Sequence, residues 1–152
     1  MSGTDDPPLL NQLNLVARDF DATIAFYRHL GLDLPDSPPF ADGVRHAEIE
    51  LPNGFVLEFD SVELARAYNA GWRTATEGSR ALIGFSVSTR DAVDERYAAL
   101  TAVGYQGLQP PYDTFWGARY AIVADPDGND VGIMSPLDPT RRSWPPEPSP
   151  TS

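Results

Sequence analysis

A glutamate inside an apolar strand-like run is the first residue of this sequence that could do chemistry. Glu58 lies between Leu57 and Phe59, and a carboxylate buried there needs a cation or hydrogen-bond donors to compensate for its desolvation. Such a carboxylate is a candidate general base for proton transfer. The structural alternatives are an ion pair with Arg45 or Arg119 and exposure on an open sheet.

A second candidate group alternates along another strand-like run. His46, Glu48 and Glu50 recur at every second position, which places one imidazole and two carboxylates on the same face of a strand. Such side chains run parallel and stand roughly 7 Å apart, so this row alone makes a poor metal cage. It predicts a polar face or cavity rim, with an acid–base or metal role as the alternative.

Aromatic side chains gather in loops, where a hydrophobic core would not ordinarily recruit them. Those beside Pro110, Pro111 and Gly117 predict a ligand lid or a subunit contact. About half of the loop aromatics can be explained by ordinary loop packing. The loop aromatics are Phe40, Trp72, Tyr112, Phe115 and Trp116.

The elements that carry these residues occur twice. An apolar strand-like run opens each half of the chain, at 12–18 and 82–89, and an amphipathic helix of about three turns follows it. Gly31 and Gly104 are expected to end these helices, because glycine readily takes the left-handed conformation of a helix C-terminus.

A hairpin turn also occurs at corresponding places in the two halves. Asn53-Gly54 and Asp127-Gly128 each lie between strand-like runs, and both dipeptides favour tight hairpin turns. The resulting order, strand, helix and three strands, is present twice. It predicts an α+β fold of two βαβββ modules whose equivalent residues surround a shared pocket.

The expected boundaries divide the chain into five parts. A short helix is predicted within the connecting segment, and the proline-rich tail is expected to lack regular structure. The parts are a disordered N-terminus at 1–8, a first module at 9–60, a connecting segment at 61–80, a second module at 81–136 and the tail at 137–152.

Alternation along the strands predicts which side chains face the pocket. The apolar residues of the opening strand must contact the helix, so Gln12 and Asn14 point to the opposite, concave side. Leu82 has the corresponding position in the second module. In the closing strands, Glu58 corresponds to Gly132.

Composition excludes several classes of function. The net charge of −11 repels nucleic-acid and lipid phosphates, so neither nucleic acid nor membrane is an expected partner. The chain has no cysteine and no lysine, which excludes thiolate and Schiff-base chemistry. Residues 1–8 have no signal-peptide pattern and no run reaches roughly 18 apolar residues. These features predict a soluble cytoplasmic protein.

Three segments resemble the vicinal oxygen chelate superfamily, which includes glyoxalase I, bleomycin-resistance proteins and extradiol dioxygenases. They are Val16-Ala17-Arg18-Asp19, the segment 26–32 with the sequence FYRHLGL, and Asp125-Pro126-Asp127-Gly128-Asn129. The resemblance covers residues 9–136. It implies two βαβββ modules that form a curled mixed sheet around one cavity, commonly in a homodimer.

The positions that hold the metal in metal-dependent members of this superfamily differ here. The resemblance places those positions at Gln12, Glu58, Leu82 and Gly132, and the last two have no ligating atom. A metal, if present, would be left with Gln12 and Glu58, and two oxygen ligands hold a cation weakly. No metal or other cofactor is therefore expected, with a divalent metal as the alternative.

The resulting prediction is metal-independent binding of a small aromatic or amphipathic molecule, such as an antibiotic or natural product. The alternatives are a metal-independent lyase or isomerase with Glu58 as general base, and a metal-dependent glyoxalase or dioxygenase with an atypical site. The expected ligand-contacting residues are Gln12, Asn14, His46, Glu48, Trp72, Leu82, Phe115, Trp116, Arg119 and Met134.

Overall fold

The computed structural model describes residues 10–70, 72–74 and 81–143. The chain divides into two compact units, Met1–Thr74 and Ala75–Ser152, called unit 1 and unit 2 below. The strands of the described residues form two mixed sheets, one of three strands and one of four, which confirms the predicted α+β class. The predicted disorder at 1–8 and the end of the tail lie outside the described residues.

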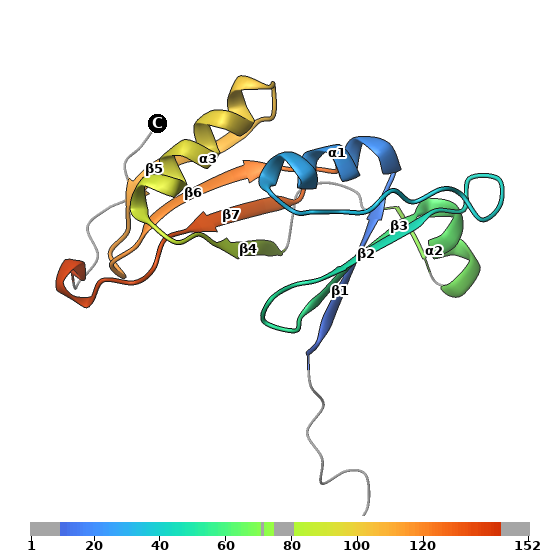
Figure 1. Cartoon of the computed structure of the whole chain (residues 1–152), viewed down its shortest axis with the longest axis horizontal. Helices are drawn as coiled ribbons and strands as arrows, with labels where there is room; N and C mark the ends of the chain where they lie inside the picture. The colour runs from blue at the N-terminus through green and yellow to red at the C-terminus, as the bar shows by residue number, and fades with distance from the viewer. Residues whose placement is uncertain (1–9, 71, 75–80, 144–152) are drawn as a thin grey trace, which may run out of the picture. The chain divides into compact units, whose positions relative to one another are not determined.

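Unit 1 is a three-stranded sheet with two helices (Figure 1). The strand order is β1-β3-β2, in which β1 is parallel and β2 antiparallel to β3. The α2 helix confirms the short helix predicted in the connecting segment. The elements are β1 (Gln12–Ala17), α1 (Phe20–Leu30), β2 (His46–Glu50), β3 (Val56–Ser61) and α2 (Val62–Tyr68).

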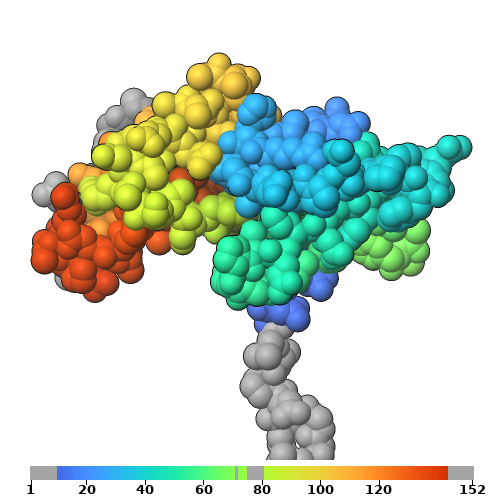
Figure 2. All heavy atoms as spheres, in the orientation of Figure 1, coloured from blue at the N-terminus to red at the C-terminus, as the bar shows by residue number. Residues whose placement is uncertain are grey.

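The first module has one strand fewer than the repeat predicts. Residues 31–45 run as a loop with one isolated bridge, between Ala41 and Val44. Three prolines between positions 35 and 39 remove the N–H donors that a strand would need. Arg28 and Arg45 instead hydrogen-bond to carbonyl oxygens of this loop. Figure 2 shows α1 and the loop, in blue to cyan, side by side on the surface of unit 1.

The α1 helix packs its apolar face on the sheet of unit 1. Asp19 caps its start by accepting from the Ala22 N–H, and Gly31 ends it with a φ of 121°, as predicted. The Tyr27 and Phe59 rings lie 4.9 Å apart between helix and sheet. The buried residues of the helix are Phe20, Thr23, Ile24, Phe26, Tyr27 and Leu30.

Unit 2 has the complete order of strand, helix and three strands. Its sheet order is β4-β7-β6-β5, with β4 parallel to β7 and the other pairs antiparallel. The α3 helix covers one face of this sheet (Figure 1), where Val93 and Leu100 are fully buried. The elements are β4 (Leu82–Ser86), α3 (Arg90–Ala102), β5 (Gly107–Asp113), β6 (Arg119–Ala124) and β7 (Asp130–Met134).

The described part of the tail is more ordered than predicted. Residues Pro139–Arg141 form a short 3-10 helix. The backbone N–H groups of Asp138 and Ser143 donate to the carbonyl oxygens of Gly117 and Phe115. These bonds hold the chain after β7 against the β5–β6 loop, so the expectation of no regular structure is wrong for this stretch.

The helices of the described ranges are all too short or too polar to cross a membrane.

Candidate functional site

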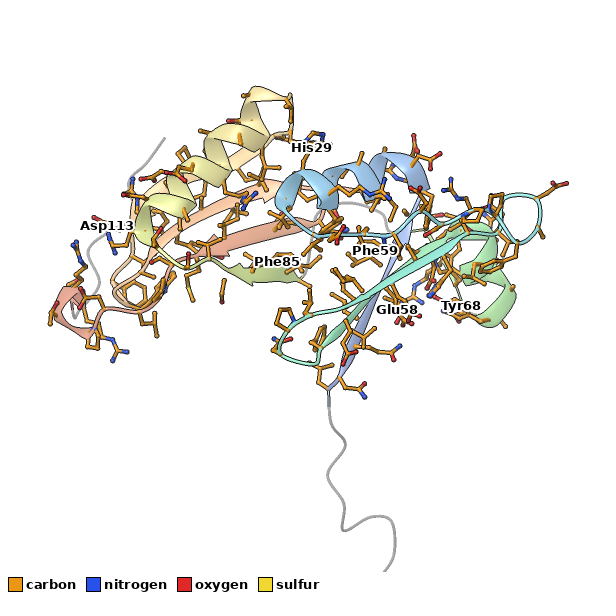
Figure 3. All side chains as sticks on the ribbon, viewed as in Figure 1. His29, Glu58, Phe59, Tyr68, Phe85 and Asp113 are labelled. Carbon is orange, nitrogen blue, oxygen red and sulfur yellow. The ribbon has the colours of Figure 1, made fainter. Side chains whose placement is uncertain are left out.

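One face of the unit 1 sheet carries most of the polar residues singled out in the sequence. The register pairs Asn14 with Glu58 and Glu48 with Glu58 across neighbouring strands. Along β3, Phe59 points toward α1 while Glu58 points to the opposite side (Figure 3). The face, called the polar face of unit 1 below, consists of Gln12, Asn14, His46, Glu48, Glu58 and Asp60.

Asp60 is the centre of the hydrogen bonds on this face, although its side chain is only 1% exposed. Its Oδ2 accepts from Asn14 Nδ2 at 3.0 Å and from the Tyr68 hydroxyl at 2.9 Å. Its Oδ1 lies 2.7 Å from His46 Nδ1. Because the carboxylate is an acceptor, this contact assigns the imidazole proton to Nδ1. In the neutral imidazole the other ring nitrogen, Nε2, then carries the lone pair.

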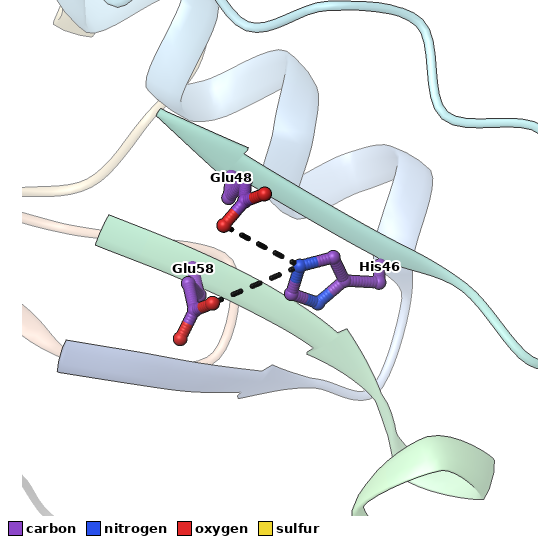
Figure 4. Close-up of side chains that lie close together, drawn as sticks. All are labelled: His46, Glu48 and Glu58. Atoms are coloured by element: carbon purple, nitrogen blue, oxygen red, sulfur yellow. Dashed lines mark ion pairs between the residues drawn. The ribbon is translucent and has the colours of Figure 1, made fainter. Parts of the chain in front are cut away.

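His46 Nε2 faces two further carboxylates. It lies 3.8 Å from Glu58 Oε1 and 4.0 Å from Glu48 Oε2, and Figure 4 shows both carboxylates approaching this one nitrogen. One ligand atom from each of the three residues falls within 4.8 Å of the other two. Both distances exceed hydrogen-bond length, so Nε2 and the two carboxylate oxygens face one another across a gap.

Glu58 is held by a glutamine from the neighbouring strand. Gln12 Nε2 donates to Glu58 Oε2 at 2.8 Å and also lies 2.9 Å from Asn14 Oδ1. The Glu58 side chain is 16% exposed and the Glu48 side chain 61%. Glu58 therefore keeps one oxygen free of Gln12 and turned toward His46, at the edge of solvent.

The arginines suggested as partners of Glu58 have other partners in the structure. Arg119 pairs with Asp94 and Asp113 within unit 2, and Arg45 pairs with Asp21 within unit 1. The Glu58 carboxylate is instead compensated by the amide of Gln12.

The corresponding face of unit 2 is aromatic and apolar. A methyl group built on Gly132 would lie 2.7 Å from the Tyr120 hydroxyl and 2.9 Å from Leu82 Cδ2. These two side chains therefore fill the place that the resemblance gives to a metal ligand. The Trp116 indole N–H donates to Met134 Sδ at 3.4 Å, and the Trp116 and Tyr120 rings lie 5.6 Å apart. The aromatic face of unit 2 comprises Leu82, Tyr112, Trp116, Tyr120 and Met134.

The remaining candidate aromatics pack locally. Phe115 contacts the edge of Trp116, with ring centres 5.1 Å apart, and keeps an exposed ring. Trp72 lies under the guanidinium of Arg66 at the end of α2. Phe40 is exposed in the loop after α1. Trp116 and Phe115 thus form one group in unit 2, and Trp72 contacts the preceding helix, α2.

The hydroxyl of Tyr68 gives the polar face a measurable titration. Burial and the hydrogen bond to Asp60 raise the pKa of Tyr68 from 10.0 to about 12. Between those two pH values the unfolded chain loses the Tyr68 proton and the folded chain keeps it. The stabilisation by this hydroxyl is therefore complete below about pH 10 and is lost as pH rises through about 12.

We expect the tyrosinate absorbance of wild type minus that of Tyr68→Phe to show one group titrating near pH 12. A difference curve centred at the ordinary value would contradict the hydrogen bond.

Comparison with known proteins gives one family. The sequence model described as the Glyoxalase/Bleomycin resistance protein/Dioxygenase superfamily matches residues 9–133. No curated protein matches the sequence significantly.

Solved structures share the fold at low sequence identity. A glyoxalase/bleomycin resistance protein/dioxygenase from Nocardioides is 26% identical, with 88% of this chain and 86% of that chain covered and a TM-score of 0.67. A family enzyme from Burkholderia phytofirmans PsJN is 24% identical, with 84% and 98% covered and a TM-score of 0.68. Lactoylglutathione lyase from Agrobacterium tumefaciens is 22% identical, with 85% and 94% covered and a TM-score of 0.60.

Proposed function

Because the chain belongs to the Glyoxalase/Bleomycin resistance protein/Dioxygenase superfamily, we propose that it binds a small amphipathic molecule, such as an antibiotic or natural product, without requiring a metal. The observation that carries the proposal is the polar face of unit 1, where Glu48 and Glu58 turn oxygens toward one point. Converging carboxylates favour a ligand with a positively charged group, and the net charge of −11 attracts such a ligand.

Within unit 2, the aromatic face offers a separate surface that suits an aromatic ligand. Trp116 and Tyr120 form an edge-to-face pair, and the neighbouring Phe115 is exposed. Aromatic rings of this kind stack on flat ligands and on cations. Substitutions on this face and on the polar face of unit 1 test the two contributions separately.

A homodimer in the cytoplasm is part of the same proposal. It rests on the superfamily resemblance and on the absence of cysteine, which suits a reducing compartment. Sedimentation velocity measures the assembly directly. A monomer at micromolar concentration would remove the dimer from the proposal and leave the binding faces of each unit intact.

The test of binding uses chelator-treated protein and aromatic cations. We expect ethidium or metal-free bleomycin to bind in isothermal titration calorimetry, and Glu58→Gln to weaken that binding about tenfold, or about 1.4 kcal/mol. Added salt should weaken it further, because the attraction involves partly exposed charges.

The matched control for this substitution is Glu50→Gln. Glu50 lies on the same strand and face as Glu48, at an exposed position beyond the convergent group, and its substitution is expected to change the affinity less than twofold. Equal weakening by both variants would show that overall charge, rather than Glu58, attracts the ligand. Failure of every aromatic cation to bind would remove the proposal.

Proton transfer without a metal is a second candidate function, favoured by the contact between Glu58 and His46. A half-buried carboxylate 3.8 Å from an imidazole nitrogen can accept a proton from a carbon acid while the imidazole orients the substrate. Turnover that survives a strong chelator and disappears in Glu58→Gln would support this candidate. Binding without turnover of any tested substrate would favour the binding protein.

A further inference from the structure

We propose that His46, Glu48 and Glu58 bind one divalent transition-metal cation, such as Zn²⁺, on the polar face of unit 1. This inference goes beyond the proposed function, which concerns the protein without metal. The proposed ligand atoms are His46 Nε2 and one oxygen from each of the two glutamates.

The separations between these atoms fit a cation at their centre. Zn²⁺ bonds to imidazole nitrogen and carboxylate oxygen at about 2.0–2.2 Å, which in a tetrahedral site places the ligand atoms roughly 3.3–3.6 Å apart. The nitrogen lies 3.8 Å from the Glu58 oxygen and 4.0 Å from the Glu48 oxygen. Small rotations of two glutamate side chains, one of them largely exposed, would close the site.

The hydrogen bond from His46 to Asp60 supplies an independent argument. A buried carboxylate lies 2.7 Å from Nδ1 and favours the proton there, so in the neutral imidazole Nε2 carries the lone pair and faces two carboxylates. Metal-binding histidines commonly donate their second ring nitrogen to a carboxylate in this way, which fixes both the tautomer and the ring orientation.

The distances also argue against a simple ion pair as the reason for this convergence. A proton on Nε2 shared with a carboxylate would bring the two atoms to about 2.7–2.9 Å. The observed gaps to Glu58 and Glu48 are about 1 Å longer than such a contact. The oxygens of Glu48 and Glu58 carry like charges, and a cation bound between them and Nε2 would be attracted to both.

The donor set selects the class of metal. One imidazole nitrogen with two carboxylate oxygens suits Zn²⁺ and its neighbours in the first transition row, whereas Mg²⁺ and Ca²⁺ prefer oxygen alone. Three protein ligands leave a fourth position for water or a ligand atom. Gln12 then has a supporting role, because its amide N–H holds the second oxygen of Glu58.

The site differs from the one that the superfamily resemblance implies. All three ligands belong to unit 1, to the β2–β3 hairpin, and neither Leu82 nor Gly132 is needed. The loss of ligand side chains at those two positions of unit 2 therefore does not remove the cation site. The register of this one hairpin brings the three ligands together.

The experiment titrates the full-length, chelator-treated protein with Zn²⁺ alone, in competition with a chromophoric chelator. We expect one equivalent per chain, weakened at least tenfold by His46→Asn and by Glu48→Gln. His46→Asn keeps an amide donor for Asp60 while removing Nε2, which protects the fold of the hairpin. Zn²⁺ should also raise the Tm of wild type but not of His46→Asn.

Two matched controls isolate the site. His29 is the other histidine of the chain and lies exposed on α1, so His29→Asn is expected to leave Zn²⁺ affinity unchanged. Glu50→Gln, on the same face of β2, should do the same. The proposal is overturned if wild type holds no more Zn²⁺ than His46→Asn, or if a control variant loses as much affinity. Because no organic ligand is present, its failure is distinct from failure of the proposed function.

Discussion

Replacing Phe59 with alanine is expected to lower the free energy of unfolding by about 3–5 kcal/mol, because a large buried aromatic side chain leaves a cavity when truncated. Phe59 is 0% exposed, and its ring packs 4.9 Å from that of Tyr27 on α1. It lies on β3, the central strand of unit 1. Urea unfolding followed by circular dichroism measures the change.

The control for Phe59→Ala is the same substitution at Phe40. That side chain is 66% exposed in the loop after α1, so Phe40→Ala is expected to change the free energy of unfolding by less than about 0.5 kcal/mol. If Phe59→Ala lowered the free energy of unfolding by less than about 1 kcal/mol, the claim that α1 packs on β3 over Phe59 would be contradicted. The position of the polar face would then be wrong as well, because alternation along β3 fixes both sides together.

That alternation is also why much of the polar face could be predicted from the sequence. Once β1 and β3 are assigned, a period of two places Gln12, Asn14 and Glu58 on the side away from the helix. The turn at Asn53-Gly54 then fixes the register of β2 on β3. Gly54 has a φ of 86° there, as a tight turn requires. Local signals were therefore sufficient for β1 and β3, the helix ends and the two hairpins.

The convergence of His46, Glu48 and Glu58 was not predictable from β2 by itself. Two side chains on one strand run parallel, and the third ligand comes from the opposite strand through the pairing of Glu48 with Glu58. Asp60 was not singled out as a site residue, although its place two positions after Glu58 put it on the same face. Its role depends on three donors from three other elements, which no local pattern indicates.

The predicted third strand after the helix of the first module is not present in unit 1, so the internal repeat gave a wrong prediction there. Similarity between the two halves predicted three strands after each helix, and the prolines at 35–39 override it by removing backbone donors. In unit 2, the segment Gly107–Asp113 forms β5 despite Pro110 and Pro111. It is an edge strand with shifts in register, a place where proline is tolerated.

Replacing Asp60 with asparagine is expected to lower the free energy of unfolding by roughly 1–3 kcal/mol, the cost of disrupting the part-buried hydrogen bonds that three side chains make to this buried carboxylate. An amide has one accepting oxygen, whereas Asp60 uses both oxygens, toward His46 on one side and toward Asn14 and Tyr68 on the other. An NH₂ turned toward Asn14 and Tyr68 meets two donors, and an NH₂ turned toward His46 requires the ring proton to move from Nδ1 to Nε2. Urea unfolding of Asp60→Asn against wild type measures the loss.

The control for Asp60→Asn is Asp42→Asn, the same change at an exposed loop position, which is expected to be nearly neutral. Combination with Tyr68→Phe tests the assignment further. Once Asp60 is an amide, removing the Tyr68 hydroxyl should cost less than it does in wild type, since the hydroxyl no longer donates to a charged acceptor. Strictly additive changes in the free energy of unfolding would show that the two side chains do not interact.

The same substitution separates the positioning role of Asp60 from direct binding of the cation. Asp60→Asn leaves His46, Glu48 and Glu58 in place, yet Zn²⁺ affinity is expected to fall about 10–100-fold, because the ring loses the partner that orients it. If Asp60 acts through His46, adding Asp60→Asn to His46→Asn should weaken Zn²⁺ binding little further. Independent losses would instead make Asp60 a ligand in its own right, and the geometry of the site would have to be redrawn around four side chains.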